Sequence, residues 1–183
     1  MSGKRSAAVF LIAMLLGIAA IAAPASTQRH ARSKQTSTNA LSPADKSFVT
    51  KAVKGNLAEI KLAQLAQEKS ANSDVKSFAK KMISDHQKMN TDMESLATRN
   101  GMTLSTTLEP KDQARYDRLS KLTGPAFDHA YINEMVKDHT TDLSEFQKES
   151  SRANNADLKK LVSDDVGTIQ HHLDSAKSLQ TKV

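Results

Sequence analysis

The sequence contains no cysteine among its 183 residues. Disulfides and thiolate metal sites are therefore excluded, and so is a lipid anchor on a cysteine at the cleavage site of a lipoprotein signal. A folded domain in this chain must be held together by its apolar core. Any metal site must use nitrogen and oxygen ligands.

Aromatic residues are also scarce, since the chain has no Trp, two Tyr and five Phe. The net charge of +6 suggests nucleic-acid binding at first sight. However, five of the 26 basic residues lie before Pro43, whereas all 20 acidic residues lie after it. Residues 43–183 are therefore nearly neutral and offer few rings on which bases stack. We expect no nucleic-acid partner.

The first 25 residues have the pattern of an export signal. Lys4 and Arg5 precede an apolar run at residues 7–23, and residues 23–25 supply the small side chains that a signal peptidase reads. The purely apolar part is about 14 residues, shorter than the roughly 20 that span a bilayer. We expect residues 1–25 to be a cleaved signal peptide, which places the protein in the periplasm, cell envelope or extracellular space with no stable membrane span. An uncleaved N-terminal anchor is the alternative.

A linker and one domain are expected to follow. Residues 26–42 are rich in Ser, Thr, Gln and Arg and show no apolar period, which is typical of a flexible linker. Ser42 is suited to cap a helix, with Pro43 at its first position and Asp45 near its positive end. The folded domain is therefore predicted at residues 43–183.

Apolar residues recur at spacings of three and four through most of this domain, which indicates amphipathic helices. Ser73 is a good cap for the second helix and Gly101 a good stop, while residues 124–125 (Gly-Pro) interrupt the pattern. The pattern predicts four long helices at about 43–71, 74–99, 126–152 and 156–181, and a short one at about 111–122.

The connections between these helices predict the topology. Two or three residues join the first long helix to the second and the third to the fourth, so each pair must form an antiparallel hairpin. The 25-residue link between the two hairpins can run the length of a bundle. We therefore expect an all-α fold: a ferritin-like four-helix bundle, with two antiparallel hairpins joined by a long crossover that contains a short extra helix.

Four polar residues fall on the apolar stripes, one in each long helix: Glu59, His86, His139 and His172. Antiparallel hairpins bring all four to one level of the bundle. Three imidazoles and a carboxylate complete a four-coordinate site for one divalent transition-metal ion, with Zn, Cu, Fe and Mn as the candidates. The sequence therefore predicts a candidate mononuclear metal site at mid-bundle.

The same residues also fit a buried polar layer without metal. Glu59 would accept hydrogen bonds from histidines, and the layer would fix the register of the helices. Asp85 and Asp138 each precede a histidine by one residue. They are candidates to orient a metal ligand on a neighbouring helix, or else to form ion pairs with lysines at the surface.

The pattern departs from that of a carboxylate-bridged di-iron centre. Such a centre needs Glu three residues before His on two helices, with two further Glu. Here Ile83, Val136 and Ile169 stand three residues before the histidines. The chain also shows no Ser-His-Asp arrangement and no Gly-rich phosphate loop. We therefore expect neither an oxidase nor another enzyme.

Two Asp-His pairs about fifty residues apart, at residues 85–86 and 138–139, are followed by a late His-Leu pair at residues 172–173. Further motifs are Phe48, Gly55-x-x-x-Glu59, Val75-Lys76-x-Phe78, Gly124-x-x-Phe127-Asp128, Tyr131 and Met135-Val136. In these motifs the chain resembles the bacterial domain-of-unknown-function 4142 family of exported ferritin-like proteins, and the resemblance covers about residues 44–180. The resemblance implies an α bundle in the periplasm or cell envelope and no particular activity.

The function that the sequence favours is an exported, non-enzymatic bundle protein with a mid-bundle metal site of Glu and His. The alternative is a structural or stress-related interaction bundle with a metal-free polar layer. The sequence identifies no partner, and both a homo-oligomer and an envelope partner stay open.

Overall fold

The computed structural model describes residues 40–183. The predicted signal peptide at residues 1–25, and all of the predicted linker up to residue 39, lie outside the described residues. Within the described part of the chain, no helix combines the length and the apolar character that crossing a membrane requires.

Residues 40–183 form helices and no strand, which confirms the predicted all-helical class. Four of the five helices in this range are long, and the third is short. Their bounds are Pro43–Lys69 for α1, Ser73–Arg99 for α2, Pro110–Ser120 for α3, Gly124–Arg152 for α4 and Ala156–Gln180 for α5.

Side-chain caps set the starts of α1 and α2. The Ser42 hydroxyl accepts the amide hydrogen of Asp45, and the Asp45 carboxylate accepts that of Ser42, which makes the predicted cap a reciprocal capping box. The predicted cap of α2 is wrong by one residue. Asn72 accepts the amide hydrogens at the start of the helix, and Ser73 is already helical.

Glycines with positive φ mark the two ends of the connection between α2 and α4. Gly101 follows the end of α2 with φ 67°, as predicted. Gly124 has φ 56°, and α4 begins there, two residues earlier than predicted. Pro125 occupies the first turn, where a missing N–H costs nothing. The Gly-Pro pair therefore starts a helix in addition to ending the previous connection.

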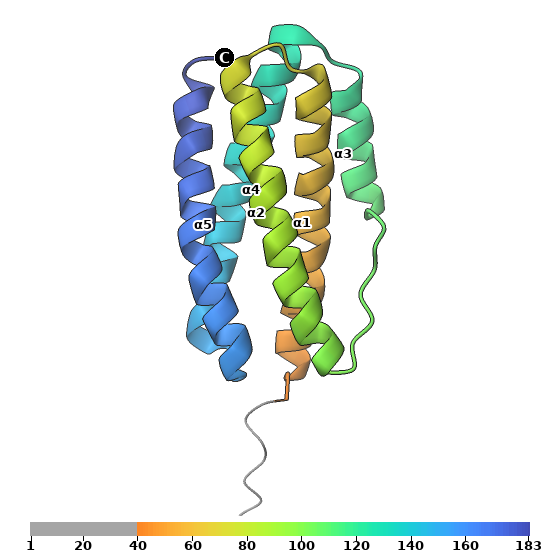
Figure 1. The fold of residues 1–183 in the computed structure, drawn as a ribbon, viewed down its shortest axis with the longest axis vertical. Helices are drawn as coiled ribbons and strands as arrows, with labels where there is room; N and C mark the ends of the chain where they lie inside the picture. Colours follow the sequence, from red (N-terminus) through yellow and green to blue (C-terminus); the bar gives the residue numbers. More distant parts are fainter. Residues whose placement is uncertain (1–39) are drawn as a thin grey trace, which may run out of the picture. The chain divides into compact units, whose positions relative to one another are not determined.

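The long helices pack side by side as two pairs (Figure 1). α1 packs along α2, and α4 packs along α5. Between the pairs, the contact of α2 with α5 is more extensive than that of α1 with α4, and α3 lies against α1 and α4. The weaker contact between α1 and α4 leaves space beside α3.

Two apolar clusters fill the interior, one toward each set of turns. The α1–α2 turn core comprises buried residues of α1 (62–66), α2 (75–82), α3 (Leu119), α4 (127–135) and α5 (176–179). The α4–α5 turn core comprises Leu41 and Ala153 with buried residues of α1 (48–53), α2 (89–97), α4 (Phe146) and α5 (158–169). In each long helix, one polar residue of the predicted site lies between the two cores, so the apolar interior is divided at mid-bundle.

Candidate metal centre

The structure brings the four predicted site residues together at this division. Each comes from a different long helix, and each is at most 3% exposed. The ring centroids of the three histidines lie 5.2, 5.3 and 5.6 Å apart. One nitrogen from each of His86, His139 and His172 lies within 4.8 Å of the other two. The shared level expected from the hairpins is therefore present, while metal binding itself stays a prediction.

His139 is oriented by its own helix. Its Nδ1 lies 2.9 Å from the carbonyl oxygen of Met135, one turn earlier in α4. A carbonyl oxygen only accepts hydrogen bonds, so Nδ1 carries the hydrogen and donates it. The other ring nitrogen, Nε2, then presents a lone pair. This atom is buried and has no hydrogen-bond partner among the described residues.

His172 is oriented by Asp85, which lies on the neighbouring helix α2. Its Nε2 is 2.7 Å from Asp85 Oδ2, and Lys81 Nζ is 2.8 Å from the same oxygen. Burial opposes ionisation of Asp85, but hydrogen bonds from Lys81 and His172 lower its pKa. The carboxylate therefore accepts the hydrogen of His172 Nε2, and the buried Nδ1 is left without a partner. Asp85 therefore contacts both kinds of partner expected for it, a histidine on a neighbouring helix and a lysine, while its role in orienting a metal ligand stays a prediction.

His86 is oriented from α1 by two side chains. Its Nδ1 lies 2.9 Å from Asn56 Oδ1 and 3.1 Å from Glu59 Oε2. Two oxygens facing Nδ1 favour the tautomer in which Nδ1 carries the hydrogen, so that Nε2 presents a lone pair. His86 Nε2 is also buried without a partner. Asn56 is absent from the sequence prediction, although its place one turn before Glu59 on the same helix face was a usable signal.

Glu59 contacts the Nδ1 atoms of His86 and His139. Its oxygens lie 3.1 Å from His86 Nδ1 and 3.4 Å from His139 Nδ1. Other groups already engage these two nitrogens. The ring nitrogens without a partner are His86 Nε2, His139 Nε2 and His172 Nδ1, and Glu59 makes no hydrogen bond with any of them. Burial, with the charge of Asp138 as a further cause, raises the pKa of Glu59 to about 8. The geometry thus sets Glu59 beside the histidine cluster as an orienting group.

The histidines are uncharged at neutral pH. Burial lowers the pKa of all three rings: that of His86 falls well below its usual value, that of His139 falls, and that of His172 falls to about 4. Neighbouring histidines contribute to the shifts of His86 and His172. Neutral imidazole is the form that binds a metal ion. Protons therefore compete little for these nitrogens at pH 7.

Asp138 has a different environment from the one that the sequence suggested. It forms an ion pair with Arg115 of α3, which also lies 3.0 Å from Asp112. Burial raises the pKa of Asp138, although the Arg115 charge opposes the shift. Asp138 therefore holds α3 against α4, whereas the expected partners were a histidine on a neighbouring helix or a surface lysine. The docking of α3 brings the guanidinium to it.

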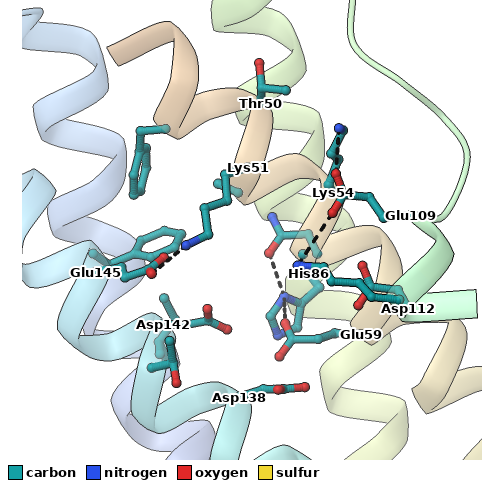
Figure 2. A pocket seen from close by; sticks show the side chains of 18 of the residues that line it. Thr50, Lys51, Lys54, Glu59, His86, Glu109, Asp112, Asp138, Asp142 and Glu145 are labelled. Carbon is teal, nitrogen blue, oxygen red and sulfur yellow. Dashed lines mark hydrogen bonds and ion pairs between the residues drawn. The ribbon is translucent and has the colours of Figure 1, made fainter. Parts of the chain in front are cut away.

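A cavity of about 840 Å³ lies beside this cluster, lined mainly by α1, α4 and the segment that contains α3, with His86 of α2 and Ile169 of α5. Figure 2 shows Glu59 and His86 on its wall, with Asp138 and Asp142 across from them and lysines further out.

Tyr131 is a further polar residue that the sequence pattern did not place in the candidate site. Its buried hydroxyl has no partner among the described residues, and burial together with the Glu59 charge raises its pKa.

Comparison with known proteins supports the family and the fold. A family model described as "Domain of unknown function (DUF4142)" matches residues 30–179. Among solved structures, the chain is similar to one described as "Crystal structure of DUF305 fragment from Deinococcus radiodurans". The TM-score is 0.71 at 16% sequence identity, and the match covers 79% of this chain and 99% of the other. At that identity the likeness concerns the fold alone. No curated protein matches the sequence.

Proposed function

This chain belongs to the DUF4142 family, a domain of unknown function, and we propose that it binds one divalent transition-metal ion between His86, His139 and His172. The observation that carries the proposal is that each of the three histidines has one buried ring nitrogen without a partner, and that one nitrogen from each ring lies within 4.8 Å of the other two. The second ring nitrogen of each histidine is hydrogen-bonded to a carboxylate, a side-chain amide or a backbone carbonyl, which orients the ring. Proteins orient metal-binding histidines in this way.

An ion satisfies this cluster better than a water molecule does. In the tautomers that these hydrogen bonds favour, none of the three partnerless nitrogens carries a hydrogen. A water molecule has two hydrogens and pairs with two of them. The third nitrogen would stay unpaired at a cost of about 1–3 kcal/mol. A divalent cation accepts all three lone pairs at once.

The distances suit an imidazole-bound ion after a small closure. Metal–nitrogen bonds of about 2.0–2.1 Å separate tetrahedral ligand atoms by roughly 3.3 Å. The histidine nitrogens lie within 4.8 Å of one another, so the rings close by at most about 1.5 Å. Rotation of the imidazole about its broad second torsion supplies such a movement. Imidazole nitrogens are suitable ligands for Zn, Cu and Fe. Mn is the fourth candidate ion expected from the sequence.

The test is element analysis of the full chain, purified without a histidine tag and exposed separately to Zn(II), Cu(II), Fe(II) and Mn(II). We expect about one ion per chain, with binding lost in His86→Ala and His139→Ala. The exposed histidines of α4 and α5 provide matched controls. His129→Ala and His171→Ala should bind as the wild type does. The absence of bound metal after all four ions contradicts the proposal, and equal binding in the two buried-site variants places the ion elsewhere.

Glu59 enters the proposal as a positioning residue, because its oxygens lie beside His86 Nδ1 and His139 Nδ1. We expect Glu59→Gln to keep the ion with an affinity lower by about 10- to 100-fold, the range for groups that orient metal ligands. The affinity is measured by competition with a chelator of known strength. Complete loss of the ion in this variant would instead make Glu59 the fourth ligand, as in the set read from the sequence.

A metal-free polar layer is the second candidate, and one observation favours it. The raised pKa of Glu59 keeps its carboxyl group protonated at neutral pH, so it has a hydrogen to donate to His86 Nδ1. His86 Nε2 would then carry the hydrogen and donate it to a neighbouring ring. Nitrogen chemical shifts of the imidazoles in chelator-treated protein identify the tautomers. A hydrogen on His86 Nε2 supports the polar layer, and one on Nδ1 supports the metal site.

The proposal keeps the finer expectations on fold and location. A ferritin-like four-helix bundle agrees with the short connections inside the α1–α2 and α4–α5 pairs and the long connection from α2 to α4. Export rests on the signal pattern of residues 1–25. A binding role without catalysis agrees with the absence of recognised catalytic motifs in the sequence. Cell fractionation tests export directly, and a full-length cytoplasmic product contradicts it.

A further inference from the structure

The cavity beside α3 gives the buried site an approach from the surface. Its wall includes Glu59 and His86, which are at most 3% exposed, and it also includes the exposed Lys46 and Lys51. Gly55 of α1 lies on the same wall and is exposed. The cavity therefore reaches from solvent to the group that holds His86.

Ion pairs neutralise most of the carboxylates around this cavity. Lys51 pairs with Glu145, and Lys54 pairs with Glu109. In Figure 2 these two ion pairs lie apart from Glu59. Arg115 pairs with Asp138 in the same way. Each carboxylate in these pairs has a cationic partner, although Arg115 is shared with Asp112 and Glu134.

Two carboxyl groups of the cavity have no such partner. Asp142 makes no hydrogen bond or ion pair with any described residue, and it lies across the cavity from Glu59 (Figure 2). Glu59 Oε1 is buried and likewise lacks a hydrogen bond, because the single hydrogen on His139 Nδ1 goes to Met135. Burial, and then the charge of Glu59, raise the pKa of Asp142 to about 8. The two groups therefore act on each other without a cation between them.

We infer that this cavity is the route by which a hydrated divalent cation reaches the three histidines, with Asp142 and Glu59 as the carboxylates that draw it inward. The inference rests on the proposed function. Among the described residues, the histidines are the group whose ligand atoms lie close enough to share an ion. The carboxylates therefore act on the cation through its water shell.

Lys46 and Lys137 also line the cavity without an ion pair to any described residue, but both are exposed, where solvent screens their charge. Glu59 is buried and Asp142 is half-buried, so the negative charge that they carry from about pH 8 upward is screened less. Charge of this kind in a low-dielectric cleft raises association rates by about 10- to 1,000-fold.

The first test removes the charge. Zn(II) transfer to the full chain is followed at pH 8 by stopped flow with a fluorescent zinc indicator, which gives the rate and the final occupancy. We expect Asp142→Asn to lower the association rate by about tenfold or more and to leave the occupancy unchanged. Asp165→Asn is the matched control, since Asp165 is also half-buried but lies outside the cavity. Its rate should equal that of the wild type.

The second test blocks the space and leaves the charge in place. A Cβ at Gly55 or at Gly167 would meet no atom within 4 Å, and both glycines lie inside helices. Gly55→Leu projects into the cavity, whereas Gly167→Leu of α5 lies outside it. We expect Gly55→Leu to slow association and dissociation by the same factor, so that the affinity stays constant, and Gly167→Leu to change neither rate.

The outcomes separate this inference from the proposed function. A wild-type chain that takes up no Zn(II) contradicts both. Full occupancy with unchanged rates in Asp142→Asn and Gly55→Leu contradicts the route alone. Loss of occupancy in Asp142→Asn also contradicts it, because Asp142 would then be a ligand.

Discussion

At the scale of single residues, the chemistry of the site depends on which ring nitrogens carry hydrogen. Hydrogen bonds of 2.7–2.9 Å engage one nitrogen of each histidine, and the other nitrogen of each ring is buried without a partner. Unpaired polar atoms in a protein interior are rare and call for a physical explanation. The explanation proposed here is a bound cation.

Replacing His139 by leucine separates the two explanations of the central cluster. If His139 Nε2 is a metal ligand, it has no partner in the metal-free protein. His139→Leu then removes an unpaired buried atom, and the metal-free protein should gain up to about 1–3 kcal/mol in free energy of unfolding. If the histidines form a satisfied polar layer, the same variant breaks hydrogen bonds and loses stability. Urea unfolding in the presence of a chelator measures the sign. A clear loss of stability contradicts the metal site.

Asp165 should make the stability of the protein depend on pH. Burial is the largest cause that raises its pKa from 3.8 to about 7. Between these values the unfolded chain loses the proton and the folded chain keeps it, so this residue lowers stability as pH rises from about 4 to about 7. Asp165→Asn should therefore stabilise the protein by about 1–3 kcal/mol at pH 8, after allowance for partial exposure. At pH 4 the gain should vanish, and an equal gain at both values contradicts the assignment.

At the scale of elements, α3 owes its position to a few contacts with α1 and α4. Leu119 is buried in the α1–α2 turn core. Arg115 is 18% exposed and forms ion pairs with Asp112 and Asp138. Because α3 and the residues before it line one side of the cavity, these contacts also keep that wall in place.

Removing the Arg115 side chain should loosen α3 selectively. Arg115→Ala leaves two mostly buried carboxylates without their cation, and we expect a loss of about 1–3 kcal/mol. Hydrogen exchange should speed up in α3 and stay slow in α1, α2, α4 and α5. Arg118→Ala is the matched control, because Arg118 is 61% exposed and surface ion pairs contribute about 0–1 kcal/mol. Equal exchange rates in the two variants contradict the role of Arg115.

At the scale of the whole domain, the polar layer interrupts an otherwise apolar interior. The α1–α2 turn core and the α4–α5 turn core lie on either side of it, and all four long helices contribute to it. A ligand bound there touches three of these helices at once. Metal binding is therefore expected to stabilise the domain as a unit.

This linkage gives a prediction for thermal unfolding. A ligand that binds only the folded state at 100 times its dissociation constant adds about 2.7 kcal/mol of stability. The ion found by element analysis should raise the Tm of the wild type and of His171→Ala. It should leave the Tm of His86→Ala and His139→Ala unchanged. Equal increases in all four proteins would mean that the stabilising ion binds outside the histidine cluster.

The sequence by itself determined the helices and the level of the site. Apolar spacing, Ser42 and Gly101 are local signals, and they set the helical class and most helix ends to within a residue or two. The meeting of Glu59 with the three histidines also follows from sequence, since it needs only the distance of each residue from the nearest turn.

Only the tertiary structure decided how the site is arranged. The docking of α3 brings Arg115 to Asp138, and this contact between separate helices leaves no periodic signal in the sequence. The choice of free nitrogen on each ring depends on partners such as Asn56 and Asp85 and on side-chain rotamers. The cavity exists because α1 and α4 pack less extensively than α2 and α5. Periodicity is a local property of the chain, whereas ring orientation, charge pairing and access to the centre depend on how distant segments pack.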